Sequence, residues 1–220
     1  MNDSEKLTEK LKDKYIFAIT GGSGVGKSTV SELFRRRGIY VADADKAARA
    51  VVEKGSRCLA ELAETFGSGI IRGDGTLDRR ALAEKAFSDE KKLAALNAVT
   101  HKYILEYLKA ELGAARERIC AIDGAVIIGS PVMGLCRAVV SVTADRETRI
   151  KRITARDKMT REAAVKRIDA QPDDGFYRDR SDYIIENNAE TGIDDRRLGV
   201  QIEFICNKIE AAAKAAAAEK

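Results

Sequence analysis

A cluster of glycines followed by a lysine and two hydroxyl side chains carries the clearest chemistry in the sequence. Residues 21–28, GGSGVGKS, fit the pattern G-x-x-x-x-G-K-[ST]. Glycines let successive backbone N–H groups turn toward one anion, and the Lys27 ammonium adds a positive charge beside them. The segment therefore predicts a site for the phosphates of a nucleoside triphosphate, and a glycine-rich turn without a ligand is less favoured. The predicted contacts are Gly24, Val25, Gly26, Lys27, Ser28 and Thr29, with the Ser28 hydroxyl also a ligand for Mg²⁺.

Carboxylates follow two of the short apolar runs. Asp43 and Asp45 lie at the end of one run, and as alternate positions of a strand they would point to the same side. A carboxylate there can accept the proton of an attacking hydroxyl, although one of the two could instead cap the next helix. Asp123 ends another run, where a carboxylate would order Mg²⁺ beside the phosphates.

Arginines recur in the stretch after the fourth apolar run. Arg149, Arg152 and Arg156 are three and four residues apart, so they share one face of a helix. A solvated basic face is the default interpretation, but opposite a phosphate site a clamp on phosphate oxygens is favoured. The next helix has Thr160 as its predicted N-cap, and the two helices could close together as a hinged lid.

Five short apolar runs are predicted to be the strands that position these residues. They alternate with helical periodicity, which indicates an α/β fold with a doubly wound, five-stranded parallel sheet. The runs are residues 15–20, 39–43, 119–123, 138–144 and 182–187. From residue 55 to 118 the alternation gives way to helical periodicity interrupted by GSGIIRGDGTLD, which predicts a short hairpin or turn. A helical insertion at a strand end is where a substrate-covering subdomain would lie.

Composition narrows the class of protein. The net charge of +4 comes from 39 basic and 35 acidic side chains, and aromatic residues make up only 5%, so a nucleic-acid partner has little support. The four cysteines are far apart and are expected to be small buried side chains rather than ligands or disulfides, as in a reducing, cytoplasmic compartment. The charged N-terminus is not a signal peptide, and no apolar run is long enough to span a membrane. The guanine-reading motif N-K-x-D is not present, which disfavours a GTPase.

Several segments in order along the chain resemble the dephospho-CoA kinases. The family's phosphate-binding loop and its D-A-D-x-x-A-R signature are similar to the start of the chain, and its later motifs follow in sequence. The matching segments are TGGSGVGKSTVSELFRRRGIYVADADKAARAVV, FGSGIIRGDGTLDRRALAEKAF, LNAVTHKYI, VSVTADRETRIKRITARDKMTREAAVKRIDAQ and SDYIIENNAE.

The resemblance implies a P-loop kinase that transfers phosphate from ATP, with Mg²⁺, to the ribose 3′-hydroxyl of dephospho-CoA. It implies Asp45 as the proton acceptor, with Lys27 and Arg156 as the other catalytic residues. Asp43, Arg49, Arg79 and His101 would contact the substrate, and Arg152 and Arg156 would close over the triphosphate. The expected organisation is a polar extension at 1–14, a kinase core at 15–54 and 119–210 with a lid at about 146–180, a helical CoA-binding insertion at 55–118, and an alanine-rich tail at 211–220.

The chain also departs from the family pattern around the acceptor. Ala125 and Gly129 stand where the family has proline and glutamate, Lys102 replaces a proline, and the loop after Gln171 is short and lacks the usual lysine. These changes concern the substrate pocket rather than the phosphate-binding loop. The alternatives are another P-loop kinase of small molecules or an ATP-binding regulatory protein without activity, and the expected assembly is a monomer or a small homo-oligomer.

Overall fold

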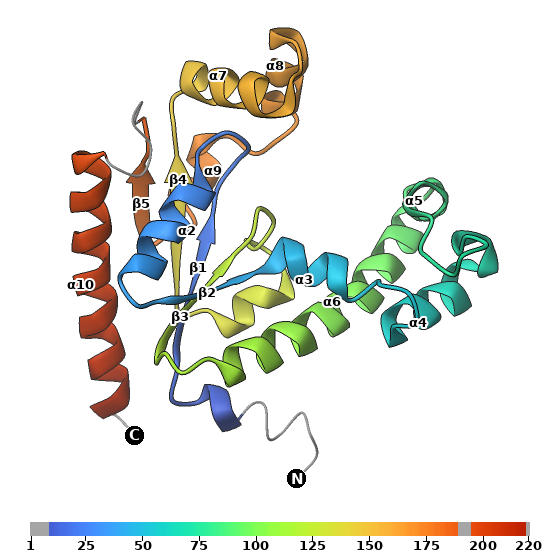
Figure 1. Ribbon diagram of the computed structural model, residues 1–220, viewed down its shortest axis with the longest axis horizontal. Helices are drawn as coiled ribbons and strands as arrows, with labels where there is room; N and C mark the ends of the chain where they lie inside the picture. Colours follow the sequence, from blue (N-terminus) through green and yellow to red (C-terminus); the bar gives the residue numbers. More distant parts are fainter. Residues whose placement is uncertain (1–8, 189–194, 219–220) are drawn as a thin grey trace.

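The computed structural model describes residues 9–188 and 195–218 and is built around one parallel sheet (Figure 1). The strands are β1 (Tyr15–Thr20), β2 (Tyr40–Asp43), β3 (Ile119–Asp123), β4 (Ala138–Thr143) and β5 (Tyr183–Glu186), in the order β2-β3-β1-β4-β5. Each of the five predicted strands is present, within a residue of its predicted ends. The doubly wound fold is thus confirmed.

Helices cover both faces of the sheet, which is why its strands are apolar throughout. All six residues of β1 and all six of β4 are buried. The helices are α2 (Lys27–Arg36), α3 (Ala44–Ala50), α4 (Arg57–Phe66), α5 (Arg79–Ala86), α6 (Glu90–Ala114), α7 (Arg146–Asp157), α8 (Arg161–Asp169), α9 (Asp174–Arg178) and α10 (Arg196–Ala218), with short 3-10 turns η1 (Ser68–Ile70) and η2 (Pro131–Leu135).

The two faces of the sheet bury separate cores. On one face α2 and α10 pack on β1 and β4, and the rings of Phe17 and Phe34 meet edge to face with centroids 5.2 Å apart. On the other face Leu108 and Leu112 of α6 pack against Ile16 and Ile122. Each of these fully buried side chains contributes about 1.5–3 kcal/mol, so the edge of the sheet that carries the site is held from both sides.

The insertion has a small core of its own and is joined to the sheet by one long helix. Helices α4 and α5 pack against the first half of α6, where Val99 is buried, whereas Leu108 in the second half belongs to the core of the sheet. The segment GSGIIRGDGTLD contains η1 and an isolated antiparallel bridge between Ile71 and Leu77, so the predicted turn is confirmed. Figure 1 shows α4 and α5 standing apart from the sheet, at the far end of α6.

Helices α7 and α8 form a two-helix unit above the sheet, within the bounds of the predicted lid, and this unit is called the lid below (Figure 1). Ile150 and Ile153 of α7 pack against Ala164 and Ile168 of α8 in a separate small cluster. The Thr160 hydroxyl accepts from the N–H of Ala163 at 3.3 Å, so this predicted N-cap is confirmed. After the lid, α9 packs against β4 and returns the chain to the sheet.

The alanine-rich end continues α10 as far as Ala218, and Ala213 is buried in the core beneath it. The four cysteines are free thiols, and all but the half-buried Cys136 are buried, as expected. Among the described residues no helix has the length and apolar character that crossing a membrane requires.

Candidate active site

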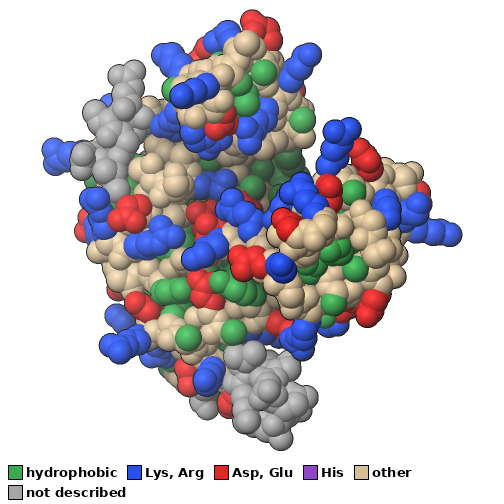
Figure 2. Space-filling view, turned by 45° about the vertical axis from the view of Figure 1, so that its right-hand side comes forward, with side chains coloured by type: hydrophobic (Ala, Val, Ile, Leu, Met, Phe, Trp, Pro, Cys, Tyr) green, Lys and Arg blue, Asp and Glu red, His purple; other side chains and the backbone are tan. Residues whose placement is uncertain are grey.

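A cavity of about 790 Å³ opens at the carboxyl ends of the strands, between the phosphate-binding loop, the lid and β2–α3. Figure 2 shows the surface hollowed between the lid and the insertion, with Lys and Arg side chains around the hollow. Ten of the predicted residues line it: Gly24, Gly26, Lys27, Ser28, Thr29, Asp43, Asp45, Asp123, Arg152 and Arg156. Parallel strands bring these residues to one edge from distant parts of the sequence.

The phosphate-binding loop requires glycine where it is tightest. Gly26, the residue before α2, has φ of 86°, in the left-handed region that side chains disfavour. At Gly21, with φ of 145°, an added Cβ would lie 2.3 Å from the carbonyl oxygen of Val142. The Lys27 Nζ donates to the Gly21 carbonyl at 3.1 Å, so the ammonium lies back across the loop. The loop backbone therefore forms a ring, and the Lys27 ammonium already lies across that ring.

Cationic and amide side chains hold the outward-facing carbonyls of this ring. The guanidinium of Arg152 donates to the carbonyls of Gly24 at 3.3 Å and Val25 at 3.2 Å, and Asn187 Nδ2 donates to Val25 at 2.9 Å. Burial lowers the pKa of Arg152 from its ordinary value. With these carbonyls bound on the outside, the loop can turn N–H groups inward to an anion, although the N–H of Ser23 itself donates to Gln171 at 2.8 Å. Val25 is buried and, unlike the other predicted loop residues, does not line the cavity.

The arginine stripe of α7 divides into two groups, which corrects the predicted three-arginine clamp. Arg152 and Arg156 line the cavity, but Arg149 is only 5% exposed and lies under the loop, where its Nε donates to the Ser23 carbonyl at 3.0 Å. One helical face passes from the buried base of the lid to its open tip. The three arginines share one helical face but therefore lie in two different surroundings.

The two acidic residues after β2 have different structural positions from the predicted ones. The strand ends at Asp43, whose carboxylate accepts from the N–H of Lys46 at 2.8 Å and caps α3. Asp45 is the second residue of that helix and not part of the strand. The prediction that Asp43 and Asp45 are alternate positions of one strand was therefore wrong. Both still line the cavity, because the helix begins at its edge.

Asp123 lies beside Asp43, its partner in the β2–β3 register, and is held by a residue that sequence reasoning missed. The buried Ser31 hydroxyl donates to the Asp123 carboxylate at 2.7 Å. Burial raises the pKa of Asp123, and the hydrogen bond from Ser31 and the charge of Lys27 oppose that rise. Ser31 lies four residues after Lys27 on α2, and this spacing was the available signal.

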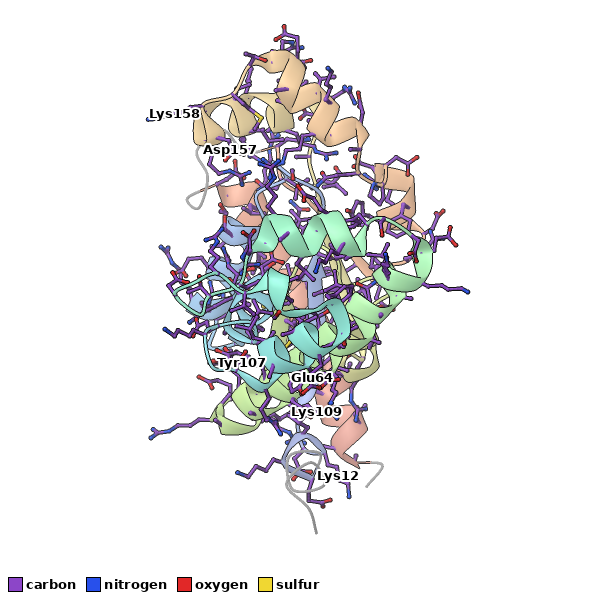
Figure 3. All side chains as sticks on the ribbon, turned by 90° about the vertical axis from the view of Figure 1, so that its right-hand side faces the viewer. Lys12, Glu64, Tyr107, Lys109, Asp157 and Lys158 are labelled. Carbon is purple, nitrogen blue, oxygen red and sulfur yellow. The ribbon has the colours of Figure 1, made fainter. Side chains whose placement is uncertain are left out.

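At the tip of the lid, two arginines share one carboxylate. Arg156 donates through Nε and a terminal nitrogen to Asp157 at 2.8 and 2.9 Å, and Arg167 of α8 donates to the same group at 2.7 Å. Asp157 and Lys158 lie side by side where α7 ends (Figure 3). The hydrogen bond from Arg156 lowers the pKa of Asp157, with the charges of both arginines adding to the effect. Arg167 also lines the cavity, and it was missed because the sequence predicted α8 as part of the lid without indicating which of its residues face the loop.

The remaining predicted substrate residues lie outside the lining of this cavity. Arg49 is exposed on α3, one turn after Asp45, and its Nε donates to the Asp45 carbonyl at 3.2 Å. Arg79 is exposed at the start of α5, and His101 is half-buried on α6. Arg79 and His101 therefore belong to the insertion, and contact with a substrate in the cavity remains a prediction for both.

The oxygen donors at this edge fit Mg²⁺. The Ser28 hydroxyl and the Asp123 carboxylate both line the cavity, and hard oxygen ligands are those Mg²⁺ prefers. Among the described residues, no group of three or more His, Cys, Asp or Glu side chains is arranged to hold a metal by itself. That arrangement suits an ion that keeps several waters and takes its other ligands from a bound triphosphate.

Comparison with known proteins identifies related sequences and structures. Residues 15–192 match the family described as dephospho-CoA kinase. A dephospho-CoA kinase of Corynebacterium glutamicum is 38% identical over 78% of this chain and 87% of its own length. One from Listeria innocua is 36% identical over 86% of this chain and 97% of its own length. The crystal structure of TT1252 from Thermus thermophilus is similar in fold, with a TM-score of 0.73 and 31% identity, covering 90% of this chain and 97% of that one.

Proposed function

The chain belongs to the dephospho-CoA kinase family, and on that premise we propose that it transfers the γ-phosphate of ATP to the ribose 3′-hydroxyl of dephospho-CoA. The observation that carries the proposal is one cavity lined by the phosphate-binding loop, the Asp45 carboxylate and two arginines of α7, Arg152 and Arg156. The β- and γ-phosphates would lie in the loop ring, with the Lys27 ammonium between them.

Asp45 is the proposed proton acceptor. Its side chain is exposed in the cavity and has no hydrogen bond or ion pair to another described residue, whereas the Asp43 carboxylate is occupied in capping α3. The 3′-oxygen would form its bond to the γ-phosphorus as the bond from that phosphorus to the β–γ bridging oxygen breaks. The hydroxyl proton would pass to Asp45, and ADP would leave.

The charge that develops on the transferred group would be met from both sides. Ser28 and Asp123 would hold Mg²⁺, which would supply positive charge to the phosphate oxygens. Arg156, and Arg167 beside it, would turn from Asp157 toward the phosphates, because a dianionic phosphate offers these forks more than one shared carboxylate. Arg152 would contact the triphosphate from its place against the loop.

The insertion is proposed to hold the rest of dephospho-CoA, a large acceptor with its own pyrophosphate. Arg49 next to Asp45 is suited to a phosphate of that acceptor, and Arg79 and His101 are proposed contacts farther along the insertion. We also propose that the enzyme works in the cytoplasm, as its free thiols suggest, as a monomer or small homo-oligomer and without nucleic acid.

A coupled assay of ADP release tests the proposal. Dephospho-CoA, adenosine, shikimate and gluconate are compared at saturating ATP and Mg²⁺, and the product is identified as coenzyme A by mass spectrometry. We expect turnover with dephospho-CoA to exceed turnover with each other acceptor by at least about 10³-fold, the discrimination that buried polar contacts provide. A preference for any of the other three acceptors would refute the proposed substrate.

A further inference from the structure

Two side chains at the base of the lid hold Ser23 of the phosphate-binding loop, and neither lines the cavity. Arg149 is 5% exposed, and its Nε donates to the Ser23 carbonyl at 3.0 Å. A buried guanidinium costs free energy unless its N–H groups are satisfied. Here the other nitrogens reach Gln171 Oε1 at 3.3 Å and Asp174 Oδ1 at 3.6 Å, so the cation is held in one orientation.

Gln171 completes the set of contacts on the same loop residue. Its Oε1 accepts from the backbone N–H of Ser23 at 2.8 Å, and its Nε2 donates to the Ser23 hydroxyl at 2.9 Å. Together with Arg149 on the carbonyl, every polar group of Ser23 has a partner from the lid base. The Ser23 backbone therefore cannot rotate without breaking at least one hydrogen bond.

The glycines on either side of Ser23 fit this arrangement. An added Cβ on Gly22 would lie 2.6 Å from a terminal nitrogen of Arg149, and one on Gly24 would lie 2.7 Å from the Arg149 carbonyl oxygen. The loop and α7 are thus in direct contact, and the close approach requires residues without side chains.

The two side chains come from opposite ends of the lid sequence, although both lie at its base. Arg149 is in the first turn of α7, and Gln171 follows α8, where the chain leaves the lid. Contacts at both ends tie the base of the lid to the loop. The tip, with Arg156 and Arg167, is exposed.

We propose that Arg149 and Gln171 are positioning residues that form a clamp on Ser23 and fix the phosphate-binding loop before the nucleotide arrives. The clamp lowers the Kd for ATP and takes no part in phosphoryl transfer. Without it, only a fraction of molecules has a competent loop, and the apparent Kd rises by the reciprocal of that fraction. The inference rests on the proposed function for the identity of the nucleotide alone.

Direct binding of ATP, measured by calorimetry without an acceptor, tests the clamp in Arg149→Gln, Gln171→Met and the double variant. We expect each single variant to raise the Kd and the KM for ATP by about tenfold, with kcat within about twofold of wild type. Because both side chains act on Ser23, the double variant should be no weaker than the worse single variant. Arg149→Lys should recover part of the loss, since it keeps a cation near Asp174 but not the fork.

Arg146→Gln is the matched control. Arg146 lies on the same helix and pairs with Asp169 at 2.7 Å on the exposed side, so its removal should leave the ATP Kd unchanged. Additive effects in the double variant, or a fall in kcat with an unchanged Kd, would overturn the clamp. Should Arg149→Gln not fold, the folded Gln171→Met variant decides, and a wild-type Kd there refutes the proposal. A protein that binds ATP as expected but does not phosphorylate dephospho-CoA would contradict the proposed function and leave the clamp standing.

Discussion

The two walls of the active-site cavity are built in different ways. On the loop wall the carbonyls of Ser23, Gly24 and Val25 are each bound by a side chain, and the surrounding atoms leave no room for a Cβ at Gly21 and Gly24. On the facing wall Asp45 and Arg156 are exposed, and among the described residues the Arg156 guanidinium donates to its neighbour Asp157 alone.

The two walls are therefore suited to two different tasks, binding the triphosphate and acting on the reacting groups. A triphosphate binds to groups that are already oriented, and such preorganisation is the main source of electrostatic stabilisation in a transition state. The facing wall consists of exposed side chains, which we expect to lose freedom when the substrates bind. We therefore expect substitutions on the two walls to differ in whether they change binding, turnover or both.

Removing the central cation of the loop wall should have the largest effect. Lys27→Ala is expected to leave the fold intact and to lower kcat by about 10³- to 10⁵-fold, the range of a cation that follows charge on the transferred phosphoryl group. Single-turnover kinetics at saturating ATP provide the measurement, with circular dichroism as the check on folding. A folded Lys27→Ala variant with wild-type turnover would contradict the role of Lys27 in phosphoryl transfer.

The two aspartates on the facing wall should differ from each other. Asp45→Asn keeps the size of the side chain but removes the proton acceptor, so kcat should fall on the order of 10²- to 10⁴-fold with the affinity for dephospho-CoA retained. Asp43→Asn is the matched variant, and it should act through the helix cap and Mg²⁺ dependence. Turnover of both at saturating substrates decides, and an active Asp45→Asn beside an inactive Asp43→Asn would reverse the assigned roles.

The lid arginine should affect turnover more than binding. Arg156→Ala is expected to lower kcat by about 10²-fold and to leave the ATP Kd nearly unchanged, because a closing arginine acts on the transition state and Arg167 remains beside it. Comparing kcat with directly measured Kd tests this. A raised Kd with unchanged kcat would instead make Arg156 a ground-state contact with ATP.

The smallest effect is expected from replacing Asp157, whose carboxylate accepts hydrogen bonds from Arg156 and Arg167 of the lid. The pKa of Asp157 in the folded protein lies below its ordinary value of 3.8, so its ion pairs stabilise the fold above that pH and are lost as pH falls through the lowered pKa. Asp157→Asn should therefore lower Tm slightly at pH 7, and the difference should vanish in strong acid. Melting curves across pH give the measurement, with the exposed Asp179→Asn as the control; a difference that grows toward low pH would contradict the assignment.

The sequence by itself determined the features that depend on local pattern. The five strands follow from short apolar runs, the phosphate-binding loop from its glycines and lysine, and the start of α8 from Thr160. It also placed Lys27, Ser28 and Asp123 at one edge, because parallel strands that end in polar residues bring those ends together. These inferences need only a residue and its near neighbours along the chain.

Only the tertiary structure decided which partner each side chain meets. Spacing of three and four residues on α7 gave Arg149 and Arg156 the same face, but the loop covers the base of that face and leaves its tip open. Asp43 and Asp45 differ because the strand ends between them, at a point set by the pairing of Asp43 with Asp123. A periodic pattern fixes direction relative to the element's own axis, whereas burial and hydrogen bonding depend on what lies opposite, and for Arg149 that is Ser23, 126 residues away in the chain.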